Sequence, residues 1–162
     1  MGTMCGRFAV TTDPALLAEK IKALDEVTGS APSGVPTPNY SATYNVAPTT
    51  TVSTVVKRHT DPDDESTRRV RSMRWGLVPV WAKTTADGGP DTKGPLLINA
   101  RSDKVTTSPA FRSSVKSKRC LVPMDGWYEW RPNGDLASGK KAPKTPFYMY
   151  AGDGEPLFMA GL

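Results

Sequence analysis

The spacing of apolar residues predicts one helix near the start of the chain. Asp13 and Pro14 supply an N-cap residue and a first-turn proline. The apolar side chains that follow recur at helical spacing, namely Leu16, Leu17, Ile21 and Leu24. We therefore predict a helix from Pro14 to about Val27, preceded by a short strand over residues 5–10.

Runs of β-branched and apolar residues predict that most of the remaining regular structure is β-strand. The predicted strands cover 51–56, 70–78, 96–101, a strand pair within 120–130, 147–150 and 157–162. The first two of these form a hairpin around the acidic turn at 61–65, and a short helix is expected near 102–114. Stretches rich in Gly, Pro, Ser and Thr predict loops over 29–43, 83–94 and 132–145.

Length and composition favour a single domain over residues 1–162. The hydrophobic fraction is 38%, and no apolar run approaches the roughly 18 residues of a membrane span. We expect a monomer in the cytoplasm. The apolar segment 157–162 stops without a turn or polar cap, so we also expect a longer protein of which this is the front part.

Charge and cysteine usage restrict the partners. The formal charge is +5, and residues 101–119 hold six basic side chains against one acidic side chain. Such a segment is either a solvated basic face or a surface that follows phosphates. Cys5, Cys120 and the single histidine, His59, are too few and too scattered for a zinc site, so we expect no metal and no cofactor.

Polar residues two apart on otherwise apolar segments share a face, because successive side chains of a strand point to opposite sides. These pairs are Cys5 with Arg7, Asn99 with Arg101, and Trp127 with Glu129. Burying such charges singly is costly, so we expect the arginines and the carboxylate to satisfy one another. Either a structural ion-pair network or an active site would explain this clustering.

Cys5 has two interpretations. An internal cysteine is usually an inert small hydrophobe. If Met4 is the true start and is removed, however, Cys5 carries an α-amine with a pKa of roughly 7.7 to 8.0 beside a thiol with a pKa of about 8.5. The amine of such an aminothiol condenses with an aldehyde to an imine, and the thiol then closes a five-membered thiazolidine ring. Cys5 is therefore a candidate nucleophile.

Five motifs in this order resemble the SOS-response-associated peptidase (SRAP) family, and together they cover nearly the whole chain. They are the Met-Cys-Gly-Arg-Phe run at 4–8, Tyr-Asn-Val-Ala-Pro at 44–48, Arg-Trp-Gly-Leu-Val-Pro at 74–79, Ile-Asn-Ala-Arg at 98–101, and Asp-Gly-Trp-Tyr-Glu-Trp at 125–130. The resemblance implies an α+β fold with a mainly antiparallel, β-barrel-like core and a few flanking helices.

The resemblance also implies a function: sensing abasic sites in single-stranded DNA and capturing them as a covalent thiazolidine crosslink. It further implies that the protein associates with the nucleoid after DNA damage. By motif position, the implied catalytic residues are Cys5 as nucleophile, Asn45, which orients the site, and Glu129 as acid and base. The implied DNA-binding residues are Arg7, Pro48, Trp75, Trp81, Asn99 and Arg101. For the tryptophans, a place in the protein core is the competing interpretation, and for Asn45 a simple turn position.

Two departures from the family pattern bear on activity. Relatives carry a catalytic histidine in a His-x-Arg-Met-Pro-type motif, which is absent from these 162 residues. Residues 1–4 must also be removed, or translation must begin at Met4, before Cys5 can form the ring. Two alternatives to lesion capture stay open: a cysteine peptidase that acts on itself or on other proteins, and a non-covalent single-strand DNA-binding module.

Overall fold

The computed structural model describes residues 5–27, 41–57, 68–83, 85–86, 94, 96–134 and 143–162. Its strands are β1 (Phe8–Val10), β2 (Leu24–Asp25), β3 (Thr43–Val46), β4 (Thr51–Lys57), β5 (Arg68–Arg74), β6 (Cys120–Met124), β7 (Gly126–Pro132), β8 (Lys144–Tyr150) and β9 (Leu157–Gly161). The helices are α1 (Pro14–Lys20) and α2 (Ser114–Ser117). The expected α+β class, with mainly antiparallel strands, is confirmed. Most of the loop residues expected over 29–43, 83–94 and 132–145, and the turn at 61–65, lie outside the described residues.

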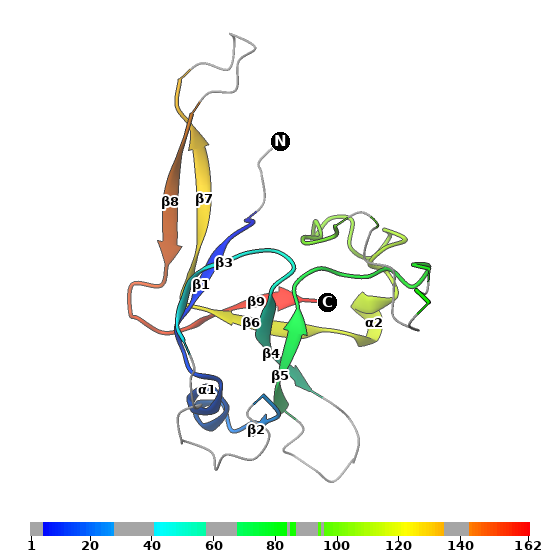
Figure 1. Cartoon of the computed structure of the whole chain (residues 1–162), viewed down its shortest axis with the longest axis horizontal. Coiled ribbons are helices and arrows are strands. Elements are labelled where there is room, and N and C mark those ends of the chain that lie inside the picture. Colours follow the sequence, from blue (N-terminus) through cyan, green and yellow to red (C-terminus); the bar gives the residue numbers. More distant parts are fainter. Residues whose placement is uncertain are drawn as a thin grey trace.

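The strands form two sheets. One has the order β3-β1-β7-β8 and is antiparallel throughout, whereas the other has the order β2-β5-β4-β6-β9 and contains one parallel pair, β2 with β5. Within the described part of the chain neither sheet closes into a barrel. The two open sheets instead pack against each other around a common hydrophobic core. Figure 1 shows β7 and β8 extending away from this body as a long hairpin.

Two clusters of buried side chains hold these elements together. Leu17 and Ala18 of α1 pack on Val55 and Val70, which places the helix against β4 and β5. The second cluster joins both sheets and consists of Phe8, Val46, Val52 and Met124, with Trp75 and Trp127 packed against it. Because β1 and β7 contribute to this second cluster, the segments on either side of Cys5 and Glu129 are anchored in the core.

Helix α1 begins where the sequence predicts and ends earlier. Asp13 is the N-cap residue, its carboxylate accepts a hydrogen bond from the backbone N–H of Ala15 at 2.8 Å, and Pro14 follows it. The predicted end at Val27 is wrong. Lys22 adopts a φ of 52°, which a right-handed helix cannot accommodate, and the chain then enters β2. The pairing of β2 with β5 therefore overrides the helical spacing of the apolar residues.

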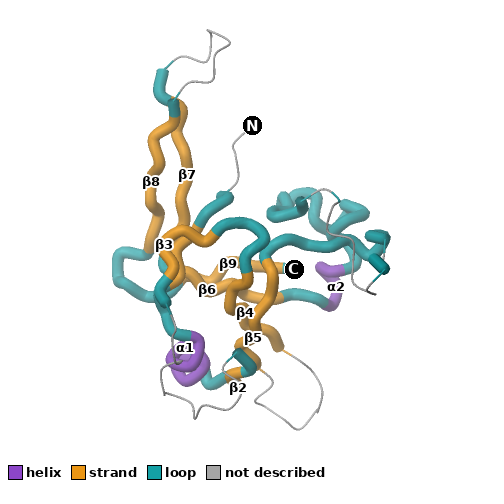
Figure 2. The backbone as a smooth tube through the Cα atoms, in the orientation of Figure 1, coloured by secondary structure: helices purple, strands orange, loops and turns teal. Residues whose placement is uncertain are grey.

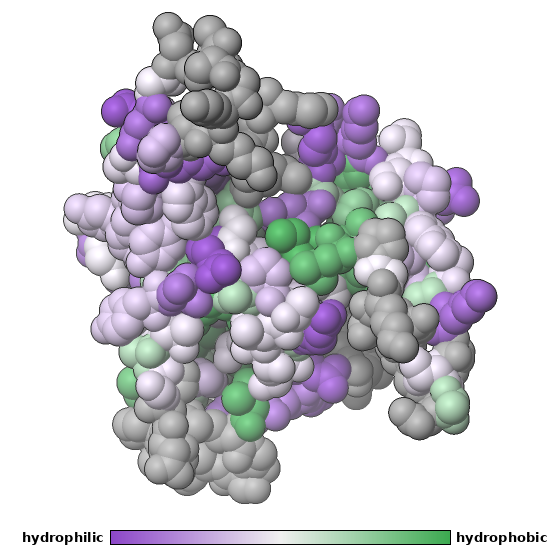
Figure 3. All heavy atoms as spheres, turned by 45° about the horizontal axis from the view of Figure 1, so that its top comes forward, coloured by the Kyte–Doolittle hydropathy of each residue, from purple (hydrophilic) through white to green (hydrophobic). Residues whose placement is uncertain are grey.

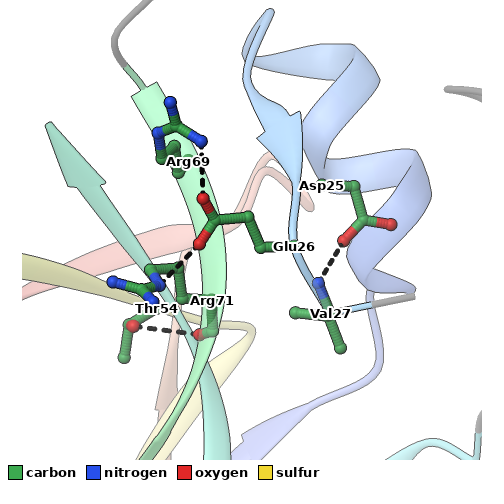
Figure 4. Close-up of polar contacts among 6 residues, drawn as sticks. All are labelled: Asp25, Glu26, Val27, Thr54, Arg69 and Arg71. Atoms are coloured by element: carbon green, nitrogen blue, oxygen red, sulfur yellow. Dashed lines mark hydrogen bonds and ion pairs between the residues drawn. The ribbon is translucent and has the colours of Figure 1, made fainter. Parts of the chain in front are cut away.

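Glu26 links the segment after β2 to strand β5 (Figure 4). Its backbone N–H donates to the carbonyl of Val70 at 2.9 Å, and its carboxylate accepts from Arg69 and Arg71, each at 2.6 Å. The two arginines are two apart and share a face of β5. These side chains are about one third exposed, so solvent screens the pairs and they contribute modestly to stability.

The central part of the chain contains both a confirmed hairpin and two incorrect predictions. Strands β4 and β5 pair antiparallel over seven residues each, as expected, although β5 ends at Arg74. The strand predicted over 96–101 is wrong, because this segment makes only an isolated bridge between Leu97 and Leu77. The helix predicted over 102–114 is also wrong: successive hydrogen bonds of mixed spacing form turns there, and α2 begins only at Ser114.

Strands β6 and β7 were predicted as a pair, and this is wrong. They follow one another along the chain but belong to different sheets. Asp125 lies between them, and its backbone N–H donates to the carbonyl of Ala9 at 2.9 Å while its carboxylate accepts from the N–H of Thr11 at 2.7 Å. The chain therefore changes sheets at Asp125. Figure 2 shows the two strands diverging from this point.

Strand β3 was not predicted, whereas β8 and β9 were. A simple turn position was one interpretation of Asn45, but Thr43–Val46 pairs with β1. Strand β8 begins at Lys144, three residues before the predicted start. All seven residues of β8 are exposed. Figure 3 shows one face of the whole molecule, on which hydrophobic residues reach the surface between hydrophilic ones.

Candidate active site around Cys5

Cys5 is held at both its side chain and its backbone. The thiol is half-buried and donates a hydrogen bond to the carbonyl of Arg7 at 3.2 Å. The Cys5 carbonyl in turn accepts from Nδ2 of Asn99 at 2.6 Å. Residues 94 positions apart in the sequence are thus joined directly at the segment that precedes β1.

Arg7 and Asn45 lie side by side on neighbouring chain segments. Nη1 of Arg7 donates to Oδ1 of Asn45 at 3.2 Å, because β1 and β3 are paired. This contact fixes the carboxamide so that its NH2 group points away from the guanidinium. Asn45 also lines a pocket of about 280 Å³ between β3 and β4, whose walls include neither Cys5 nor Glu129. The pocket is therefore adjacent to the candidate site and is not the site itself.

Glu129 reaches the site from β7. The backbone N–H of Tyr128 donates to the carbonyl of Arg7 at 3.0 Å, which holds β7 alongside the N-terminal segment. The Tyr128 hydroxyl donates to the carbonyl of Tyr44 at 3.0 Å and so ties β7 to β3 across β1. Sequence reasoning missed this role of Tyr128, although the residue lies within the Asp-Gly-Trp-Tyr-Glu-Trp motif.

The surroundings of Cys5 favour the protonated thiol. Burial is the largest cause that raises the pKa of Cys5 above its ordinary value, and the negative charge of Glu129 adds to it. Backbone hydrogen bonds with Arg7 and Tyr128 act in the opposite direction and lower the pKa. The net shift is upward, so the thiol is mainly protonated at neutral pH and needs a base when it reacts.

The alkylation of Cys5 tests this arrangement. Below the raised pKa the thiolate fraction, and with it the rate of reaction with iodoacetamide, rises about tenfold for each pH unit. Glu129→Gln removes a charge that disfavours the thiolate, so the pKa of Cys5 falls and alkylation at pH 8 becomes faster. Peptide mapping by mass spectrometry over pH 6 to 11 measures the rate.

Cys120 provides the control in the same sample. Its pKa is also raised, but burial is the cause and Glu129 is not. The Glu129→Gln change should therefore leave the alkylation profile of Cys120 where it is. Equal shifts at both cysteines, or none at Cys5, would contradict the proximity of Glu129 to Cys5.

Trp75 packs against the core cluster, so its ring is less available for stacking on a DNA base than a fully exposed tryptophan would be. Its ring centroid lies 5.2 Å from that of Phe8, and its Nε1–H donates to the carbonyl of Ile98 at 2.9 Å. This bond places Ile98 next to the core, and Asn99 then points to Cys5.

Pro48 is half-buried in the turn after β3. The two residues that follow it, Thr49 and Thr50, form backbone hydrogen bonds with Trp75. Trp81 is 58% exposed on the turn that follows β5.

Arg101 does not join the other charged residues. Its Nε and Nη2 donate to the two carboxylate oxygens of Asp103, each at 3.0 Å, and this pair is exposed. Arg101 lowers the pKa of the Asp103 carboxyl through this hydrogen bond. Ion pairs elsewhere in the structure join Lys20 to Glu155 and Glu26 to Arg69 and Arg71. The expected ion-pair network of Arg7, Arg101 and Glu129 is therefore wrong. Arg7 bonds to Asn45 and Arg101 pairs with Asp103, while the charge of Glu129 acts on Cys5.

The described residues contain no group of three or more His, Cys, Asp or Glu side chains placed to hold a metal ion. Neither helix in the described part of the chain is long and apolar enough to cross a membrane. The single histidine, His59, lies outside the described residues. The chemistry available at the site consists of a thiol, a carboxylate, a guanidinium and two carboxamides.

Comparisons with known proteins agree with this assembly of motifs. A family model described as "SOS response associated peptidase (SRAP)" matches residues 4–162. The chain is 31% identical over 167 residues to the abasic site processing protein YoqW of Bacillus subtilis, covering 96% of this chain and 65% of that protein. It is 34% identical over 167 residues to the abasic site processing protein YedK of Escherichia coli, covering 98% of this chain and 59% of that protein.

Solved structures show the same fold. A protein from Bacteroides thetaiotaomicron matches with a TM-score of 0.65 and 25% identity, over 96% of this chain and 58% of that chain. A phage-related protein from Bordetella bronchiseptica matches with a TM-score of 0.63 and 26% identity, over 98% of this chain and 60% of that chain. The chain thus spans about three fifths of the length of the relatives it matches.

Proposed function

We propose that this chain, which belongs to the SOS response associated peptidase (SRAP) family, processes abasic sites in DNA. Relatives at 31% and 34% identity are named abasic site processing proteins, and this supports the substrate class. The observation that carries the proposal is the placement of Cys5, whose thiol and carbonyl are both anchored beside the carboxylate-bearing strand β7.

The proposed reaction is covalent capture of the ring-opened sugar in single-stranded DNA. Once Cys5 is the first residue, its amine adds to the C1′ aldehyde, and loss of water gives an imine. The thiol sulfur then bonds to the imine carbon, and the thiol proton ends on the nitrogen. The product is a thiazolidine ring, and its mass is that of protein plus DNA less one water.

The residues around Cys5 divide this work between them. Glu129 moves protons for imine formation and accepts the thiol proton, which the raised pKa of Cys5 makes necessary. We assign Arg7 to a DNA phosphate and Asn45, to which Arg7 donates a hydrogen bond, to a sugar hydroxyl. Asn99 keeps the Cys5 backbone in place, so that the amine and the thiol stay on the same side of the bound aldehyde.

The test is incubation of the chain, beginning with Cys5, with a single-stranded oligonucleotide that contains one abasic site. We expect an adduct that survives denaturing electrophoresis and has the mass given above. An undamaged oligonucleotide, and an abasic site reduced beforehand with borohydride, should give none. Failure of the verified N-terminal cysteine to form any adduct would exclude covalent capture and favour plain DNA binding or proteolysis.

Glu129→Gln is expected to slow adduct formation by roughly 10²- to 10⁴-fold, because the general acid–base contribution is lost. Quenched time courses at saturating oligonucleotide measure the rate of this step. Glu155→Gln is the matched control, since Glu155 pairs with Lys20 on the surface. Equal rates for Glu129→Gln and the unmodified chain would remove Glu129 from the mechanism.

A further inference from the structure

The β7–β8 hairpin presents a second set of side chains next to Glu129. The two strands pair antiparallel with Glu129 opposite Phe147, Trp127 opposite Met149, and Arg131 opposite Thr145. Directly paired residues point to the same face, with Cβ atoms about 4.5 to 5.5 Å apart. Phe147, Met149 and Arg131 therefore share the face that carries Glu129 towards Cys5.

These side chains remain open to solvent. Phe147 is 41% and Met149 44% exposed. The guanidinium of Arg131 lies over one face of the Phe147 ring, with its central carbon 5.1 Å from the ring centroid, so a base would stack on the other face or displace the guanidinium. On the opposite face the aromatic rings contact one another: Tyr128 contacts Trp130 and Tyr148, and Tyr148 stacks on Tyr150. The rings of that face are exposed as well, Tyr148 to 39% and Tyr150 to 67%, but among the described residues Phe147 is the exposed aromatic ring on the hairpin face that carries Glu129.

An exposed ring next to an arginine matches the requirements of single-stranded nucleic acid. A nucleobase stacks on the ring whatever its sequence, while the guanidinium binds the adjacent phosphate. The charge of the hairpin agrees with such a partner. Between residues 131 and 144 the sequence holds four basic residues and one acidic residue, Asp135, and β8 itself contains no acidic residue.

We propose that Phe147 and Arg131 form a nucleobase subsite, in which a base flanking the abasic site stacks on Phe147 and its phosphate binds Arg131. This inference rests on the proposed function, because the subsite gains its role from Glu129 on the same face. The subsite positions the strand so that the lesion lies over Cys5. It takes no part in the bond-forming step.

Equilibrium binding of an undamaged, fluorescein-labelled oligothymidylate to the chain tests the subsite without the covalent reaction. Phe147→Ala is expected to weaken binding by about 5- to 150-fold, the range found for the loss of one stacked base. Phe147→Trp retains a stacking ring and should restore binding. Arg131→Gln should reduce the slope of log affinity against log salt by about 0.7, the value for one phosphate contact.

Phe158→Ala is the matched control. Phe158 is 40% exposed, almost the same as Phe147, but it lies on β9 in the other sheet. Its removal should leave affinity within twofold. The subsite would be overturned if Phe147→Ala binds as tightly as the unmodified chain, or if Phe147→Ala and Phe158→Ala lose affinity equally. It would also be overturned if the unmodified chain does not bind the oligonucleotide. Light scattering that shows a dimer dissolved by Phe147→Ala would overturn it too, since a second copy would then cover this face.

The adduct assay separates the two proposals. If the unmodified chain captures an abasic site while Phe147→Ala binds undamaged DNA normally, the proposed function stands and the subsite fails. If Phe147→Ala and Arg131→Gln weaken binding as described but no N-terminal cysteine forms an adduct, the subsite stands as a DNA contact and covalent capture fails.

Discussion

A chain that begins with alanine in place of Cys5 is expected to form no stable adduct with an abasic site. Its amine can still condense with the aldehyde, but without the sulfur no thiazolidine ring closes, and the imine hydrolyses back to its components. Adduct yield on a denaturing gel should fall below detection. Borohydride added during the reaction should trap the imine, which shows that the variant is folded and reaches the lesion.

Cys120→Ala is the matched control for the loss of a thiol. Cys120 is half-buried on β6, which belongs to the sheet that does not contain β1 and β7. This variant should give the same adduct yield as the unmodified chain. A stable adduct formed by Cys5→Ala would show that another nucleophile captures the lesion, and the role of Cys5 would have to be abandoned.

Phe8→Ala is expected to be the most destabilising of the substitutions considered, lowering the free energy of unfolding by about 3 to 5 kcal/mol. Phe8 is 3% exposed, contacts the ring of Trp75, and packs with Val46, Val52 and Met124 between the two sheets. The total free energy of unfolding of a domain is about 5 to 15 kcal/mol, so this loss would unfold a measurable fraction of the molecules. Urea denaturation followed by tryptophan fluorescence measures the loss.

The site should be lost together with the stability, because β1 positions Cys5 and Arg7. Phe158→Ala, at 40% exposure, removes the same atoms from the surface and should cost less than about 1 kcal/mol. If the two variants unfold at the same urea concentration, the cluster around Phe8 is not the core that joins the sheets.

Local patterns predicted the elements whose causes are local. Asp13 and Pro14 start α1 through a cap and a fixed φ, both of which are properties of adjacent residues. Strands β4 and β5 pair as predicted, and the β-branched residues of β4 favour an extended strand. Likewise, the order of the five motifs identified the family that the comparisons show.

Elements determined by distant partners were predicted poorly. Helix α1 ends at Lys20 because β2 pairs with β5, more than 40 residues away. The apolar segment 96–101 has strand-like composition, but its one β-bridge in the described part of the chain joins Leu97 to Leu77. Strands β6 and β7 looked like neighbours, and Asp125 separates them by bonding to Ala9 and Thr11.

The sequence by itself determined which side chains are available for chemistry: a cysteine near the start, a carboxylate in the Asp-Gly-Trp-Tyr-Glu-Trp motif, and arginines and asparagines in the other motifs. Only the tertiary structure decided which of them meet. Asn99 reaches the Cys5 carbonyl and Arg7 reaches Asn45, whereas Arg101 turns to Asp103. The reason is physical: hydrogen bonds and ion pairs act over a few ångströms, and chain folding, not sequence position, sets those distances.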